Sequence, residues 1–294
     1  MLRPALIGTQ ARLGCWIAHG LKTLAQFCVY GDPEGTAADS SDWNTAFVVD
    51  SLPKAAFEAR WKGAEAVDWA GVDGSLDTQG FAPLPVILEP SECDLLAALY
   101  SEDARFRSRI DMSRFRFGVG EYKYFAAPLP ALVQSLRETL YARLAPASNR
   151  WQVRLKPDTT DIFPASLDAF LAQCHDAGQT RPTPLLLSYA AGGYNCLHQD
   201  LYGEIAFPLQ LVVMLGQPGD DWDGGEFILV ENVPRAQSRA EVITAPQGHG
   251  IVFTTRYRPV KGSRGWYRVT MRHGVSRVRR GTRYTLGIIY HDAK

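Results

Sequence analysis

The residues best suited to do chemistry are His198 and Asp200, at the end of a stretch of apolar residues and glycines that begins at Leu185. They are two positions apart, and alternate side chains of an extended strand point to the same face. One imidazole and one carboxylate should therefore converge on a single point. A second imidazole from a distant strand would complete a 2-His-1-carboxylate metal site, which leaves coordination positions open and is the arrangement of non-haem Fe(II) oxygenases.

The second imidazole has three candidates farther along the chain, His249, His273 and His291. If a 2-oxo acid fills the open positions of the metal, its far carboxylate must meet a fixed cation, and an Arg side chain is the best fork for such a group. Composition and spacing alone leave the three histidines open.

The string His273-Gly-Val-Ser-Arg-Val-Arg-Arg-Gly-Thr-Arg283 resembles the closing motif of the Fe(II)/2-oxoglutarate-dependent dioxygenases, in their prolyl-4-hydroxylase-like branch. In that branch an Arg or Lys follows the distal His at the offset that separates His273 from Arg283. The resemblance implies that His273 is the third metal ligand and that Arg283 holds 2-oxoglutarate. His249 has Pro259 at this offset, and the sequence ends before the corresponding position after His291.

Other pieces of the chain resemble the same family, and the resemblance extends over residues 76–292. Tyr189-Ala-Ala-Gly-Gly-Tyr194 is similar to its tyrosine and glycine-rich turn before the first ligands, and Trp222-Asp-Gly-Gly-Glu226 is similar to its Gly-Gly-Glu turn. The resemblance implies that Tyr189 donates a hydrogen bond to 2-oxoglutarate. Thr285, on the same strand face as Arg283, is expected to add another.

By this resemblance the chain is an oxidoreductase that uses Fe(II), 2-oxoglutarate and O2, with ascorbate as a reductant. His198, Asp200 and His273 would bind the iron and, with Arg283, form the catalytic set. The expected substrate is peptidyl, prolyl included, or a small molecule, which is hydroxylated with release of succinate and CO2. Two alternatives stay open, namely oxidative demethylation of alkylated nucleic acid and a catalytically silent, cupin-like binding module.

The overall charge gives no sign of a polyanionic partner, because Lys+Arg and Asp+Glu number 31 each among 294 residues. Residues 254–283 nevertheless contain ten Lys or Arg and no acidic residue. Arg256, Arg258, Lys261, Arg264 and Arg268 could grip a phosphate backbone, with Trp266 and Tyr267 stacking a base. We favour a solvated sheet edge, since strand positions scatter charges over both faces. Nucleic acid is thus an open but not favoured partner.

The five cysteines are odd in number and show no CxxC spacing, and neither a secretory signal nor a membrane-spanning run is apparent. We therefore expect reduced thiols in a cytoplasmic protein with no membrane partner. Alternation places the Cys196 thiol on the ligand face, where it would be sensitive to oxidation, although a small buried residue is the favoured interpretation. His249 is expected to be a turn residue at the start of a strand, with a substrate contact as the less favoured alternative.

The periodicities predict an α+β fold. Helices are expected to start at Pro90 with Ser91 as N-cap, and to cover 130–144 and 164–175, with a strand or hairpin over 115–125. Six strands are expected at 184–189, 207–215, 226–232, 250–254, 266–272 and 282–290.

These elements predict a double-stranded β-helix, a jelly-roll or cupin-like core, with the N-terminal helices packed on one sheet. Residues 1–75 should form an extension, partly disordered, with a short helix near Leu52 to Lys62. Residues 76–294 should form the dioxygenase domain, with helical support over 90–180 and the β core over 181–294.

Overall fold

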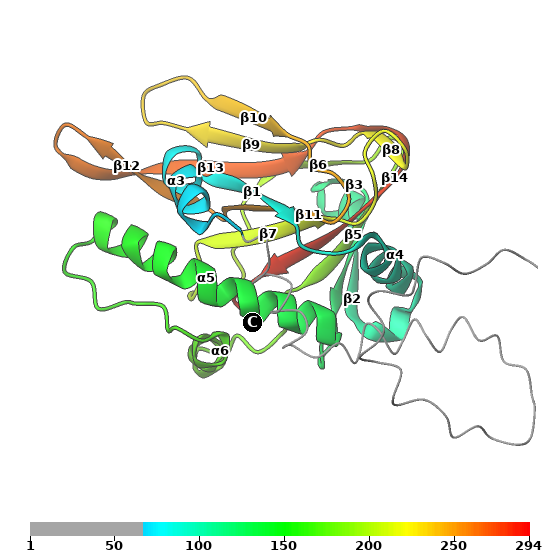
Figure 1. Ribbon diagram of the computed structural model, residues 1–294, viewed down its shortest axis with the longest axis horizontal. Helices are drawn as coiled ribbons and strands as arrows, with labels where there is room; N and C mark the ends of the chain where they lie inside the picture. The colour runs from blue at the N-terminus through cyan, green and yellow to red at the C-terminus, as the bar shows by residue number, and fades with distance from the viewer. Residues whose placement is uncertain (1–66) are drawn as a thin grey trace, which may run out of the picture. The chain divides into compact units, whose positions relative to one another are not determined.

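The computed structural model describes residues 67–294, and these contain four α-helices and two antiparallel sheets (Figure 1). The short helix expected near Leu52 lies outside the described residues. The helices are α3 (Trp69–Gln79), α4 (Pro90–Ala98), α5 (Ala131–Leu155) and α6 (Leu167–Asp176), and three 3-10 helices cover Leu99–Ser101, Asp103–Arg105 and Met112–Phe115.

The strands divide between the two sheets. They are β1 (Phe81–Val86), β2 (Phe106–Asp111), β3 (Gly118–Val119), β4 (Glu121–Phe125), β5 (Leu185–Ala190), β6 (Tyr194–His198), β7 (Leu209–Met214), β8 (Trp222–Gly224), β9 (Phe227–Asn232), β10 (Arg239–Ile243), β11 (His249–Thr254), β12 (Tyr257–Gly262), β13 (Gly265–Val275) and β14 (Val278–Ile289).

The larger sheet has eight strands in the order β1-β11-β7-β14-β5-β4-β2, with β8 paired to β14. The smaller sheet has six, in the order β10-β9-β13-β6-β3, with β12 paired to β13. Strands adjacent in each sheet are mostly distant in sequence, and the sheets face each other as in Figure 1. This is the expected double-stranded β-helix. Strands β1 to β4 precede residue 181, so the sheets draw on chain from before the expected core boundary.

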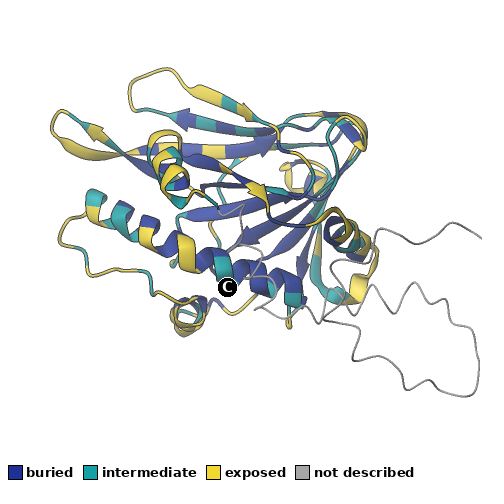
Figure 2. Cartoon of the chain, viewed as in Figure 1, coloured by how far each residue is buried: buried dark blue, intermediate teal, exposed yellow. Residues whose placement is uncertain are grey.

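Strand β7 shows how one strand serves two hydrophobic cores. All six of its residues are buried, as expected for a strand covered on both faces. Leu211 and Val213 belong to the core beneath the helices, whereas Val212 and Met214 belong to the core between the sheets. In Figure 2 the buried residues, drawn in dark blue, gather in the strands at the middle of the view, and exposed residues, drawn in yellow, lie toward the outside. The larger sheet is thus fixed on one face by helices and presents its other face to the site.

Helix α5 packs along the larger sheet, as Figure 1 shows. Arg137 of this helix is buried and donates to the carbonyls of Ile289 and Tyr290 at 3.1 and 2.8 Å, and to the carboxylate of Asp292 at 2.8 Å. A charge that is buried with this many partners is well compensated. The end of β14 is therefore tied to the helix layer.

Three helix boundaries differ from those expected, and the simplest is that of α6, which begins at Leu167 rather than Pro164 with Ser166 as N-cap. Helix α4 has Glu89 rather than Ser91 as N-cap, because Pro90 takes the first helical position and the Glu92 side chain accepts from the Glu89 N–H at 2.9 Å. Helix α5 continues eleven residues past the expected end, through Pro146. Contacts to α3 hold this second half, including a hydrogen bond from Trp151 Nε1 to Asp77 at 2.7 Å.

The six expected strands all form, with shifts of a few residues at their ends. The segment at 115–125 is only partly extended, because residues up to Phe115 form a 3-10 helix before β3 and β4. None of the helices within residues 67–294 combines the length and apolarity needed to cross a bilayer.

Candidate metal and co-substrate site

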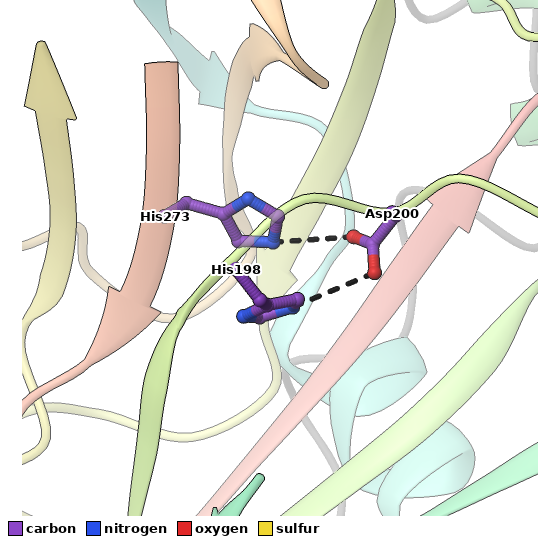
Figure 3. Close-up of side chains that lie close together, drawn as sticks. All are labelled: His198, Asp200 and His273. Carbon is purple, nitrogen blue, oxygen red and sulfur yellow. Dashed lines mark ion pairs between the residues drawn. The ribbon is translucent and has the colours of Figure 1, made fainter. Parts of the chain in front are cut away.

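His198, Asp200 and His273 come together between the sheets (Figure 3). His198 is the last residue of β6 and lies opposite His273 of β13 in the strand register. The Nε2 atoms of His198 and His273 lie 3.4 and 3.2 Å from the two carboxylate oxygens of Asp200. One donor atom from each residue fits within 4.8 Å of the others. Two imidazole nitrogens and one carboxylate are a donor set suited to Fe(II) with positions left open.

The first two ligands, His198 and Asp200, do not lie on the same strand as expected. Asp200 lies two residues beyond the end of β6. Its neighbour Gln199 holds this segment, because its amide donates to the carbonyls of Arg256 and Met271 at 2.9 and 2.8 Å. The expected convergence is present, but it depends on an anchored loop as well as on the strand.

Strand β6 also contains an irregularity next to the ligands. His198 lies opposite His273 and Asn195 lies opposite Val275, so three steps on β6 match two on β13. Such a bulge shifts the alternation of side chains. Asn195 points inward and donates to Tyr189 Oη at 3.3 Å. Cys196 is exposed and lies on the pocket lining, so the favoured expectation of a small buried residue is wrong.

The imidazole of His198 is oriented by a hydrogen bond from its Nδ1 atom. Its Nδ1 lies 2.8 Å from the carbonyl oxygen of Cys196, to which it can only donate. In the neutral imidazole the hydrogen is then on Nδ1, and the lone pair of Nε2 is left for a metal ion. Metal-binding histidines are oriented by bonds of this kind. His273 is buried and packs between the rings of Phe227 and Phe253, with centroid distances of 5.9 and 4.7 Å.

The three groups form a strongly coupled electrostatic cluster. Burial by itself would raise the pKa of Asp200, but hydrogen bonds and charge from His198 and His273 hold that pKa well below its usual range. Burial and the charge of His198 lower the pKa of His273. Burial opposes the charged form of His198, but the hydrogen bond and charge of Asp200 outweigh it and raise the pKa of His198. Metal binding requires neutral imidazoles and a carboxylate, so it would displace any proton that His198 holds on Nε2.

Two tyrosine hydroxyl groups form a chain of hydrogen bonds that ends at the carboxylate of Asp200. Tyr202 Oη donates to Asp200 Oδ1 at 2.8 Å, and Tyr124 Oη of β4 donates to Tyr202 Oη at 3.0 Å. The guanidinium carbon of Arg107 lies 4.5 Å from the centre of the Tyr124 ring. Neither Tyr202 nor Arg107 was singled out from the sequence, where the only hint was that Tyr202 stands two positions after Asp200.

Arg283 of β14 lies on the opposite wall of the same pocket and is only 2% exposed. Its Nη1 donates to Thr285 Oγ1 at 3.3 Å, and its guanidinium carbon lies 5.7 Å from the centre of the Tyr189 ring. Its Nε has no hydrogen-bond partner within residues 67–294. Burial lowers the pKa of Arg283 to about 10, against the opposing effect of Tyr189 and Glu226, so it stays charged at neutral pH.

A glycine makes room for this guanidinium. Gly224 and Gly225, in the expected Gly-Gly-Glu turn, have φ angles of 73° and 63°, which favour glycine. A Cβ on Gly225 would lie 2.9 Å from the Cδ of Arg283. The turn therefore needs glycine for its backbone conformation, and at Gly225 for space as well.

The pocket has a volume of about 360 Å³ and brings the three candidate ligands together with all three candidate co-substrate residues. Tyr122, in the segment expected to be a strand or hairpin, and Gln210 also line it. The two rival histidines lie elsewhere. His249 begins β11 as expected and does not line this pocket, while His291 is fully buried and its Nδ1 accepts from the N–H of Phe207 at 3.2 Å.

The basic run divides into buried and exposed members. Arg258 is buried and pairs with Glu231, at 2.8 Å from Nε and 2.5 Å from Nη2. Exposed members lie along β12 and β13, and the guanidinium carbon of Arg154 lies 4.7 Å from the centre of the Trp266 ring. The five residues considered for a phosphate backbone do not line the pocket, namely Arg256, Arg258, Lys261, Arg264 and Arg268. The run thus does not form one continuous basic face beside the metal ligands.

Comparison with protein families gives an independent assignment. A family model described as "Oxygenase, catalysing oxidative methylation of damaged DNA" matches residues 120–293, more than half of the chain. A second model, for phage P22-like portal proteins, matches residues 21–122, a smaller share that does not assign a family. Uncharacterized proteins from two strains of Mycobacterium tuberculosis are 52% identical over 169 residues, or 58% of this chain and 72% of theirs.

Solved structures with similar folds are more distant. A Pseudomonas putida prolyl-4-hydroxylase is 15% identical, with a TM-score of 0.44 over 77% of this chain and 100% of its own. A Burkholderia pseudomallei oxidoreductase of the 2OG-Fe(II) oxygenase family is 16% identical, with a TM-score of 0.43 over 76% of this chain and 92% of its own. These likenesses are weak. On its family match the chain belongs to this oxygenase family, and it is an oxygenase.

Proposed function

We propose that this oxygenase oxidises methyl groups on damaged DNA bases, and that His198, Asp200 and His273 hold its iron. The observation that carries the proposal is the pocket itself. The three converging donor atoms and the buried guanidinium of Arg283 line the same pocket. The description of the matching family supports DNA as the substrate. The proposal thus takes up the nucleic-acid alternative in place of the peptidyl or small-molecule substrate that we favoured from sequence.

The three ligands would hold Fe(II) on one side and leave its remaining positions facing the pocket. When bound, Fe(II) supplies activation of O2, which oxidises a substrate C–H bond to C–OH while 2-oxoglutarate becomes succinate and CO2. Asp200 contributes the negative charge of the donor set, and Tyr202 keeps its carboxylate oriented through the 2.8 Å hydrogen bond. A hydroxylated N-methyl group can then leave its nitrogen as formaldehyde.

Arg283 would bind the far carboxylate of 2-oxoglutarate. Its charge is buried, its Nε lacks a partner within residues 67–294, and the two contacts of its terminal nitrogens are long, at 3.3 Å to Thr285 and 3.6 Å to Met214 Sδ. A carboxylate would supply the charge-assisted hydrogen bonds that these contacts do not. Thr285 and Tyr189 would each add a hydrogen bond, Tyr189 through the hydroxyl that Asn195 now contacts.

The rest of the pocket suits a flat, partly apolar substrate. Its lining includes Tyr122, Leu187 and Phe253 beside the polar ligands, and its volume lies within the usual range for small-molecule sites. An enzyme that acts on a base must take that base out of the stack and into a pocket of this kind. The proposed substrate is therefore a methylated base in a single strand or one extruded from a duplex.

The test is turnover of methylated oligonucleotides with Fe(II), 2-oxoglutarate and air. We expect loss of the methyl group by mass spectrometry, with succinate formed in equal amount. Asp200→Ala should abolish both products, whereas Asp161→Ala, at an exposed residue that does not line this pocket, should not. Succinate formed only with peptides would overturn the DNA assignment, and no succinate with any substrate would support a silent binding module.

A further inference from the structure

Two phenylalanines stand exposed at the rim of the pocket. Phe115 and Phe117 are 53% and 46% exposed, and their rings stack with centroids 5.5 Å apart and planes 19° apart. Phe117 lines the pocket and Phe115 does not, so the stacked pair leads from the pocket outward. Exposed aromatic rings next to a site are unusual, because large apolar side chains gain free energy by burial.

The loop that carries these rings is well anchored. The Asp111 side chain accepts from the N–H of Ser113 at 3.0 Å, which fixes the start of the loop. At its other end the Phe117 carbonyl accepts from the N–H of Cys196 at 2.8 Å, and β3 pairs with β6. The rings are thus connected by backbone hydrogen bonds to the strand that ends in His198.

The same loop carries positive charge. Arg116 lies between the two phenylalanines, is exposed, lines the pocket and has no ion pair or side-chain hydrogen bond within residues 67–294. Arg114 is exposed, and its ion pair with Asp111 is long, at 3.6 Å. Asp111 is already engaged by Ser113 through both its N–H and its hydroxyl. The cations of the loop are therefore available to an outside anion.

Neighbouring residues extend this surface around the pocket. Leu197 and Leu201 are exposed apolar residues of the lining. Arg277 places its guanidinium carbon 4.9 Å from the centre of the Tyr194 ring, next to the paired strands β3 and β6. The surface thus combines flat apolar faces with guanidinium groups, and an occupant with planar rings and negative charges would be complementary to both.

We propose that Phe115 and Phe117, with Arg114 and Arg116, form a platform for single-stranded nucleic acid. The base next to the target stacks on the phenylalanines, the arginines contact its phosphates, and the target base enters the pocket. Proteins that bind single strands combine stacking rings with basic side chains in this way. This inference rests on the proposed function and adds the surface that selects a nucleic-acid strand.

The first experiment measures binding of a fluorescein-labelled, single-stranded methylated oligonucleotide to the iron- and 2-oxoglutarate-loaded protein without oxygen. Phe115→Ala should weaken binding roughly tenfold, and Phe115→Tyr should restore it, because stacking depends on the ring. The phenylalanine is half exposed, so folding should be unaffected, and a thermal melt checks this. The matched control is Trp266→Ala, an exposed aromatic residue on β13 outside the pocket, which should bind like the wild type.

A second measurement reports the stacking itself. With 2-aminopurine placed next to the methylated base, its fluorescence should fall when the wild type binds and stay high at saturating concentrations of Phe115→Ala. In a salt titration, Arg116→Gln should reduce the magnitude of the slope of log affinity against log salt by about one, the change expected when one phosphate contact is lost. A general loss of structure would instead lower binding in both variants, without changing the 2-aminopurine fluorescence at saturation in one and the salt slope in the other.

The outcomes separate this inference from the function on which it rests. Wild-type affinity in Phe115→Ala, or an equal loss in Trp266→Ala, would overturn the platform even if the enzyme demethylates DNA. Tight binding of peptides that displace the oligonucleotide would assign the surface to protein substrates and overturn it as well. If the wild type forms succinate with 2-oxoglutarate but binds no oligonucleotide, the platform fails while the oxygenase chemistry stands.

Discussion

Arg283 brings a positive charge into the interior, and no carboxylate of residues 67–294 forms an ion pair with it. The described residues offer it a hydroxyl, a thioether and an aromatic ring, and its Nε goes unpaired. A buried cation with such weak partners costs stability unless a ligand supplies the missing negative charge. The burial and weak partners of Arg283 thus indicate an anionic ligand independently of the motif that first pointed to this residue.

Replacement of Arg283 by Ala should weaken 2-oxoglutarate binding at least tenfold, since a hydrogen bond to a charged group contributes about 1.5 to 3 kcal/mol. Titration calorimetry with the iron-loaded protein measures this. Arg280→Ala is the matched control, because that arginine is on the same strand but exposed and paired with Asp223 at 2.7 Å. An unchanged affinity in Arg283→Ala would remove Arg283 from the co-substrate site.

Tyr202 should affect the metal without touching it. Tyr202→Phe removes the hydrogen bond to Asp200 and should lower Fe(II) affinity by roughly 10- to 100-fold, the usual effect of residues that orient metal ligands. Tyr124→Phe breaks only the more remote bond to Tyr202 and should have a smaller effect. Anaerobic metal titration compares them, and equal affinity in all three proteins would show that the network is not needed.

The difference between the ligands and their supports explains what could be predicted from the residues. His198 and Asp200 stand in one short motif, His273 and Arg283 stand in a second that resembles a family motif, and the structure brings the two motifs into one pocket. Tyr124 is far from Asp200 in sequence and reaches it only through Tyr202. Its role depends on which strands become neighbours, and no spacing in the chain encodes that.

Strands and helices show the same contrast at the scale of elements. Apolar periodicity identified the six long strands, since burial on a sheet face selects alternating or continuous apolar residues. It did not identify the bulge in β6, which needs knowledge of the partner strand. Nor did it extend α5 through Pro146, because the contacts to Asp73 and Asp77 of α3 that hold that half come from tertiary structure.

The buried pair of Arg258 and Glu231 joins β12 to β9, and Arg258 also donates to the Asp77 carbonyl at 3.0 Å. Glu231→Ala should reduce the free energy of unfolding by about 3 to 5 kcal/mol, because it leaves the arginine buried without its counter-charge. Urea denaturation measures the loss. Glu241→Ala, at a partly exposed residue of the adjacent β10, serves as control, and a loss in Glu231→Ala no larger than in this control would contradict a structural role for Arg258.

At the scale of the whole molecule, the balanced charge hides an uneven distribution. The basic run that stood out in the sequence is split between a buried structural arginine and an exposed hairpin. The exposed arginine that lines the pocket is instead Arg116, in a segment expected to be a strand or hairpin, and Arg114 lies two residues before it. Folding decides which charges gather around the site, so composition alone could not locate the surface.

Stability of the fold should fall in mild acid. Burial lowers the pKa of His291 to about 4, whereas an exposed histidine titrates near 6.5. Between these values the unfolded chain binds the proton that the folded chain excludes, so stability is lost as pH falls from 6.5 to 4. The loss could reach about 3 kcal/mol.

Urea denaturation of metal-free protein at about pH 7.5, above the range of the loss, and at about pH 5, within it, would check this. His291→Gln should show a smaller difference in unfolding free energy between the two conditions than the wild type does. His249→Gln, which removes a partly exposed imidazole, is the control. Equal differences in His291→Gln and the wild type would mean that His291 does not set the acid sensitivity.

The most direct test of the site is anaerobic titration of the metal-free protein with Fe(II), followed by 2-oxoglutarate. The account predicts one tight Fe(II) site, 2-oxoglutarate binding that requires the metal, and loss of both in His273→Ala. His249→Ala should bind like the wild type, since that residue lies outside the pocket. Retention of tight, stoichiometric Fe(II) binding by His273→Ala would contradict the claim that His198, Asp200 and His273 together form the iron site.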